Sequence, residues 1–184
     1  MKLFAIGFVV LLPLAAQEIK LPPSFDRLAE KASEVVDVTL DSSMLQMASR
    51  FLSDKDADEV KAKKLVSGLK GIYVKSFEFD KAGEYDMADV EALRAQVRGP
   101  AWSRIVGVRS KKNGENSEVY LKNEGGQVTG LLIIAAEPKE LTVVTINGSI
   151  DPAQLRDLGG HFGVPKMDVG GAKKSGTPSP DKED

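Results

Sequence analysis

The sequence contains no cysteine among its 184 residues. Without a thiol the chain cannot form a disulfide, so a folded domain must be held together by its core alone. A bacterial lipoprotein anchor is also excluded, because that lipid is attached to a cysteine at the point of signal cleavage. We therefore predict that the protein is not a lipoprotein.

Motifs for catalysis and for metal binding are missing as well. There is no G-x-S-x-G elbow, no H-E-x-x-H and no glycine-rich phosphate loop. The lone histidine, His161, lacks the partners that a catalytic triad requires. Residues 54–59 begin like a calcium loop, but Glu59 and Leu65 stand where glycine and a bidentate glutamate are needed. We therefore predict no catalytic residue, no metal site and no cofactor.

The charge of the chain is close to neutral, with 25 Lys and Arg against 27 Asp and Glu. Removing residues 1–16 would remove Lys2, which leaves 24 basic and 27 acidic residues and a net charge of −3. Such a balance gives no electrostatic footprint for nucleic acid or for an anionic membrane. We therefore predict no nucleic-acid partner.

The N-terminus has the pattern of an export signal. Lys2 supplies a positive charge, residues 3–12 form an apolar run, and small residues end at Ala16. The run is too short for a stable transmembrane helix, although a buried N-terminal helix is an alternative. We predict cleavage near Ala16 and Gln17, no transmembrane span in the mature chain, and a periplasmic or secreted protein.

The mature chain is expected to form one α+β domain over residues 17–163. Residues 164–184 are poor in apolar side chains, which predicts a disordered tail. Helical patterns begin after Ser24, after Asp41 or Ser42, after Asp56 in a capping-box pattern with Glu59, and after Asp86. The first is expected to run from Phe25 to about Val35, and a last short helix is expected after Asp151-Pro152.

Strands dominate the second half of the domain. Four strand patterns cover residues 103–111, 117–123, 130–136 and 141–148. The links between them are short, and Asn113-Gly114 favours a type I′ turn. These four strands are therefore expected to form an antiparallel meander. Two earlier strands, 36–40 and 71–80, would join the sheet, with helices mainly on one face.

The strand at residues 71–80 supplies the candidate partner or ligand face. Four of its alternate residues share one side of the strand: Tyr73, Lys75, Phe77 and Phe79. If this side of the strand is exposed, it would suit a ligand or a protein partner. The alternative is an interior strand that is covered on both sides. Residues 131–136 are apolar on both alternating sets and predict a central, covered strand.

Several segments resemble a known family. They are "VDVTLDSSMLQMASRFL", "KKLVSGLKGIYVKSFEFD", and "GLLIIAAEPKELTVVTINGSID" followed by "LRDLGG". With the export signal, they resemble the domain of unknown function 4252 family of small exported bacterial proteins. The resemblance implies an envelope protein with partners in envelope signalling or stress regulation, and it transfers no catalytic residue. Family members often look like lipoproteins, from which this cysteine-free chain departs.

These observations favour an exported, non-enzymatic module that binds an envelope or extracellular protein. Two alternatives stay open. The first is a carrier that holds an apolar ligand between the sheet and its helices. The second is an uncharacterised hydrolase, whose acid pair the sequence cannot single out among 27 acidic residues.

Overall fold

The computed structural model describes residues 19–151. The predicted export signal, its cleavage point at Ala16 and Gln17, His161 and the predicted tail lie outside these residues. Within them, four helices and a six-stranded sheet give the α+β class that the sequence predicts. No helix in this range is long and apolar enough to cross a membrane.

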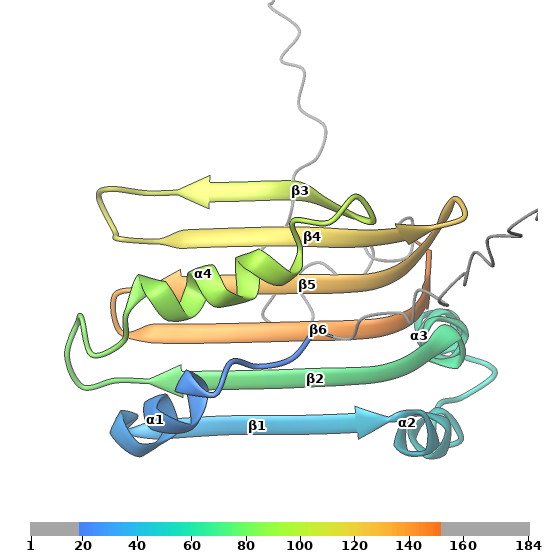
Figure 1. Cartoon of the computed structure of the whole chain (residues 1–184). Coiled ribbons are helices and arrows are strands. Elements are labelled where there is room, and N and C mark those ends of the chain that lie inside the picture. Colours follow the sequence, from blue (N-terminus) through green and yellow to red (C-terminus); the bar gives the residue numbers. More distant parts are fainter. Residues whose placement is uncertain (1–18, 152–184) are drawn as a thin grey trace, which may run out of the picture.

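The sheet is antiparallel throughout, with strand order β1-β2-β6-β5-β4-β3 (Figure 1). The last four strands form the predicted meander, and β2 then pairs with β6 while β1 pairs with β2. The strands are β1 Glu34–Asp41, β2 Leu69–Glu78, β3 Trp102–Arg109, β4 Asn116–Glu124, β5 Gln127–Glu137 and β6 Glu140–Ile150.

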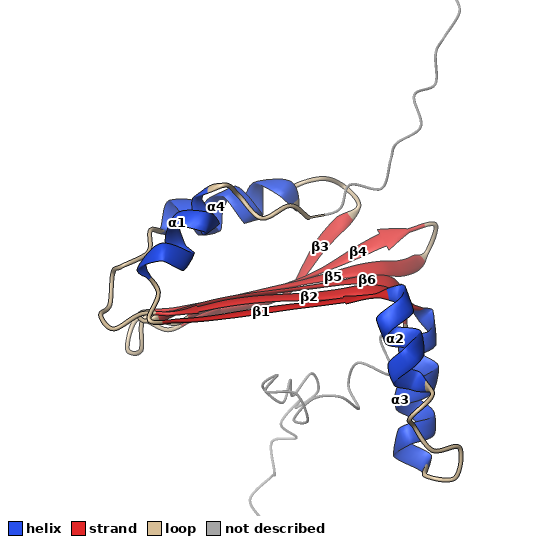
Figure 2. Cartoon of the chain, turned by 90° about the horizontal axis from the view of Figure 1, so that it is seen from below, coloured by secondary structure: helices blue, strands red, loops and turns tan. Residues whose placement is uncertain are grey.

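The helices divide between the two sides of the sheet. Figure 2 shows α1 and α4 over one face, whereas α2 and α3 stand at one end and extend away from the other face. We call these the covered face and the open face, and we call α2 with α3 the arm. The helices are α1 Ser24–Lys31, α2 Ser42–Ser49, α3 Ala57–Gly68 and α4 Met87–Gln96.

The main core lies between the covered face and its two helices. Phe25 from α1 meets Phe77 from β2 edge to face, with ring centroids 5.5 Å apart. Val90 and Leu93 of α4 pack into the same cluster. Each helix therefore buries one apolar stripe against alternate residues of the central strands.

A second, smaller cluster lies where the arm meets the open face. Leu45 of α2 packs there with Leu69 and with Val119, Leu131 and Ile150 of the sheet. No described helix lies over the remainder of the open face (Figure 2). The prediction of full cover for residues 131–136 is therefore only partly right, because Ile133 and Ala135 on that face are half-buried.

Most capping predictions are confirmed. Asp41, Asp56 and Asp86 each accept a backbone N–H from the first turn of the helix that follows. The capping box is wrong in its second half, because the Glu59 carboxylate accepts from the N–H of Ser53. Ser24 is also not a cap: it lies inside α1, whose N-cap makes no side-chain hydrogen bond.

One boundary prediction fails where tertiary pairing competes with local pattern. The first helix ends at Lys31 instead of Val35, and β1 begins at Glu34. Val35 pairs with Phe77 in β2, and this long-range pairing outweighs the helical pattern.

The predicted type I′ turn at Asn113-Gly114 is wrong, because only the glycine has positive φ. Gly125-Gly126 has positive φ at both positions, as that turn requires.

Candidate functional site

The fold divides the candidate face of β2 into a buried half and an accessible half. Phe77 and Phe79 are only 0% and 2% exposed and belong to the main core. Tyr73 is 38% exposed, and Lys75 is partly exposed. Because α1 and α4 cover only part of the sheet, Tyr73 and Lys75 are the two members left for a ligand or a partner.

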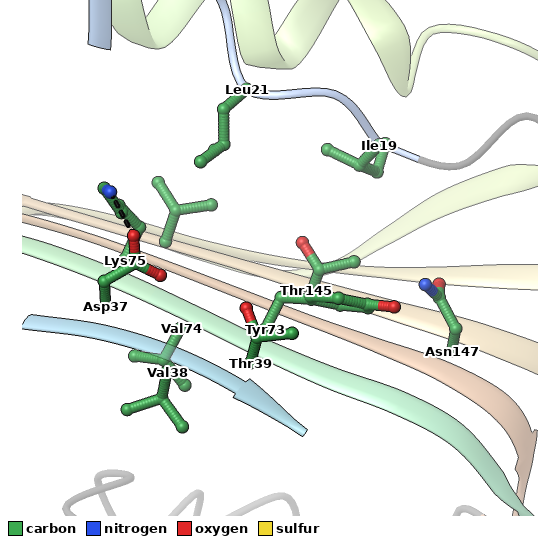
Figure 3. A pocket seen from close by; sticks show the side chains of 11 residues that line it. Ile19, Leu21, Asp37, Val38, Thr39, Tyr73, Val74, Lys75, Thr145 and Asn147 are labelled. Carbon is green, nitrogen blue, oxygen red and sulfur yellow. Dashed lines mark hydrogen bonds and ion pairs between the residues drawn. The ribbon is translucent and has the colours of Figure 1, made fainter. Parts of the chain in front are cut away.

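A cavity of about 210 Å³ lies over this accessible half (Figure 3). Its floor comes from β1, β2 and β6, and its polar side chains are those of Asp37, Thr39, Tyr73, Lys75, Thr145 and Asn147. Ile19 and Leu21 face this floor from the opposite side (Figure 3). We call this space the Tyr73 cavity.

The upper wall of the Tyr73 cavity is fixed by a side-chain clamp. Gln96, at the end of α4, donates from Nε2 to the carbonyl of Lys20 at 2.7 Å. Its Oε1 accepts the N–H of Lys20 at 2.9 Å. These two hydrogen bonds connect residues 19–21 to α4, so that Ile19 and Leu21 are held over the sheet.

One ion pair borders the cavity. Lys75 bonds to Asp37 on the neighbouring strand, directly opposite in register. The ammonium group also lies 5.9 Å from the centroid of the Phe77 ring. The pair adds no net charge to the cavity wall.

The covered face holds a second charged group, centred on Glu118 of β4. Arg94 of α4 donates from Nε to one carboxylate oxygen, and Arg104 of β3 donates to the other at 2.9 Å. Burial by itself would raise the pKa of Glu118, but Arg94 and then Arg104 hold that pKa below its ordinary value. The carboxylate is therefore ionised and fully engaged, which suits a structural link and not proton transfer.

The open face carries four glutamates in one row. Glu34, Glu78, Glu140 and Glu137 lie directly opposite one another on β1, β2, β6 and β5. All four are exposed, and none takes part in an ion pair within the described residues. With neighbouring strands about 4.8 Å apart, the row places four negative charges within roughly 14 Å. We call this the glutamate row.

Aliphatic side chains lie further along the open face, toward the arm. Four residues from the glutamates on the same four strands, a parallel row consists of Val38, Val74, Val144 and Ile133. Val36 and Val38 at the sheet edge are 40% and 36% exposed. Apolar side chains also emerge near the arm, including Met47 at 57% and Phe51 at 84% exposed. The open face thus has an acidic end and, nearer the arm, exposed aliphatic side chains at the sheet edge.

The glutamate row does not form a metal site. Within residues 19–151, no group of three or more His, Cys, Asp or Glu side chains is placed to hold a metal ion. Side chains on neighbouring strands stand side by side and perpendicular to the sheet, so they do not converge on one point. The glutamate row instead presents its negative charge at the protein surface.

Comparison with known families identifies the domain. The family model described as Domain of unknown function (DUF4252) matches residues 28–158. The chain belongs to this family. The resemblance seen in the sequence is thereby confirmed, and the match spans β1 to β6. No curated protein matches the chain.

In this DUF4252 domain, sequence reasoning missed the open face and half of the cavity. Glu34, Glu78, Glu137 and Glu140 each stand at the end of a strand, which is a visible signal in the sequence. Their alignment depends on the register between strands distant in sequence, which the sequence leaves open. The same holds for Thr39, Thr145 and Asn147.

Proposed function

We propose that this DUF4252 protein is an exported, non-enzymatic protein of the bacterial envelope that binds another protein through its open face. The glutamate row beside exposed valines carries the proposal. Exposed apolar patches on soluble proteins commonly mark interaction sites. A role in envelope signalling or stress regulation is the expectation that comes with the family resemblance.

The chemistry of the open face defines its partner. Four carboxylates that form no ion pair within the described residues call for lysine or arginine side chains on the opposing surface, and the exposed Val36 and Val38 call for aliphatic ones. An anionic membrane surface or a nucleic acid would be repelled by the same row. The partner is therefore a protein with a basic cluster next to an aliphatic patch.

The alternatives have less support. A hydrolase needs a carboxyl group free to exchange a proton, but the buried Glu118 has both oxygens engaged by arginines. A carrier of apolar ligands needs an apolar space between sheet and helices. Phe25, Phe77 and Leu93 fill that space on the covered face, and the Tyr73 cavity has a polar floor.

Site-specific photocrosslinking tests the proposal in bacteria that produce the full chain. A photoreactive residue at Val38, on the open face, is expected to give an adduct with one protein. The double change Glu78→Gln/Glu140→Gln and raised salt should each weaken that adduct, because both remove the charge attraction. A photoreactive residue at Asp26, on α1 and the other side of the sheet, should give none.

The charge-matched control is Asp26→Asn/Glu30→Gln, which removes two negative charges from α1. This variant should leave the Val38 adduct unchanged. An adduct that is indifferent to Glu78→Gln/Glu140→Gln, or equal yields from Val38 and Asp26, would refute the assignment of the open face. An adduct between two copies of the chain would show a dimer interface in its place.

The glutamate row also predicts a gain in stability on neutralisation. Glu78 faces Glu34 on one side and Glu140 on the other, and directly opposed like charges are destabilising. Glu78→Gln is therefore expected to raise the free energy of unfolding by about 0.5 kcal/mol at low salt. Urea denaturation measures this, and the gain should shrink at high ionic strength. A loss of stability would contradict the register of the three strands.

A further inference from the structure

We propose that the Tyr73 cavity is a binding site for a single neutral sugar ring or a polyhydroxylated molecule of similar size. The site lies on the other side of the sheet from the open face, so it is independent of the protein contact proposed above. The inference rests on free polar groups, on the placement of the Tyr73 ring, and on the balance of charge.

Four polar side chains in the cavity have no hydrogen-bond partner within the described residues: Thr39, Tyr73, Thr145 and Asn147. Three of them form a row across neighbouring strands, since Tyr73 lies opposite Thr39 on one side and opposite Thr145 on the other. Thr145 is only 6% exposed. Hydroxyl and amide groups both donate and accept, so they match a ligand that does the same.

Tyr73 provides an aromatic surface because of Gly71. A Cβ atom at Gly71 would lie 2.9 Å from the Cε2 and hydroxyl oxygen of Tyr73. Since glycine leaves that space empty, the Tyr73 ring lies along its own strand and points toward Asn147 (Figure 3). An aromatic ring that lies flat can take the partly positive C–H face of a sugar against its negative π-face.

The opposite wall of the Tyr73 cavity and the charge of its lining narrow the class of ligand further. Ile19 and Leu21 face the floor, so a ligand needs an apolar side in addition to its hydroxyl groups. The charged side chains in the lining, Asp37 and Lys75, neutralise each other. A cavity of about 210 Å³ is smaller than the roughly 300–1,000 Å³ of common ligand sites. One neutral ring fits this description, and a long chain does not.

A fully apolar ligand fits less well. It would cover the hydroxyls of Thr39, Tyr73 and Thr145 without replacing their water, and each polar group buried without a partner costs free energy. A charged ligand would need a net charge in the wall, which the Asp37–Lys75 pair does not supply. These two classes serve as negative controls.

Backbone NMR on the mature full chain, titrated with sugars, tests the proposal. The probes are glucose, galactose and N-acetylglucosamine, with glucuronate as the charged control and cyclohexane-1-methanol as the apolar control. At least one neutral sugar is expected to shift the amide signals of Thr39, Tyr73 and Thr145 saturably, with a dissociation constant in the millimolar range or below. The two controls are expected to bind more weakly.

Variants locate the binding groups. Thr145→Val keeps the side-chain shape and removes the hydroxyl, and Tyr73→Leu removes the aromatic face. Each is expected to weaken sugar binding by about tenfold while the remaining spectrum shows a folded domain. Val36→Thr on the open face is the matched control, because Val36 does not line the cavity, and this variant should bind as the wild type does.

Three results would overturn the proposal: no saturable shift with any of the three sugars, binding that survives both Thr145→Val and Tyr73→Leu, or stronger binding of either control ligand. Because the photocrosslinking test uses the open face, each outcome leaves the protein-binding proposal to stand or fall separately.

Discussion

Replacing Phe77 with aspartate is expected to unfold the domain. Phe77 is 0% exposed and its ring packs against Phe25 of α1. Removing a buried phenylalanine side chain alone costs about 3–5 kcal/mol, and a carboxylate without a partner in that space adds several more. Since a domain is typically stable by only about 5–15 kcal/mol, circular dichroism should show loss of the cooperative urea transition.

Tyr73→Asp is the matched control for Phe77→Asp. It makes the same change to aspartate on the same strand and on the same side of the sheet, four residues away. Because Tyr73 is 38% exposed, its loss should change the free energy of unfolding by about 1 kcal/mol or less. Equal destabilisation by both substitutions would contradict the division of β2 into a buried and an accessible half.

Glu118→Gln is expected to have the second largest effect. The Glu118 and Arg94 side chains are only 7% and 12% exposed, and one further Arg94 nitrogen, Nη2, is buried without a partner. Removing one member of a buried ion pair costs about 3–5 kcal/mol, and Arg94 would keep only the half-exposed Glu91 as a partner. Urea denaturation at neutral pH measures the loss.

The control for Glu118→Gln is Glu91→Gln. Glu91 also pairs with Arg94, but its side chain is 50% exposed, so water replaces much of the lost interaction. Its effect should stay below about 1 kcal/mol. Similar losses for the two variants would show that Glu118 does not hold α4 to the sheet.

The pKa of Glu118 gives the sign of the pH dependence. The folded-state pKa lies below the ordinary value of 4.5, because Arg94 and Arg104 outweigh the effect of burial. The stability gained from the ionised form is therefore complete above that ordinary value and is lost as pH falls through the folded pKa. The stability difference between wild type and Glu118→Gln should shrink on acidification. A difference that stays constant down to about pH 3 would contradict this assignment.

The sequence by itself determined the local structure of this DUF4252 protein. Asp41, Asp56 and Asp86 cap helices as predicted, since a cap is a contact between residues two or three positions apart. The meander also followed from local signals, because its four strands are joined by short links. The α+β class and the family were therefore within reach of the sequence.

Only the tertiary structure decided how β2 is used. One side of this strand carries Tyr73, Lys75, Phe77 and Phe79. Alternation alone predicts the same degree of burial for all four residues. The position of α1 and α4 buried the two phenylalanines and left Tyr73 and Lys75 at the cavity. That position depends on packing between distant segments, which alternation in one strand does not encode.

The tertiary structure also decided the two surfaces that we propose to be functional. The glutamate row exists because β1, β2, β6 and β5 pair in one register, and a slip of one residue would turn a strand's glutamate to the covered face. The same pairing sets Thr39 and Thr145 on either side of Tyr73. Side-chain chemistry was present in the sequence, but strand register between distant segments determined which groups stand together.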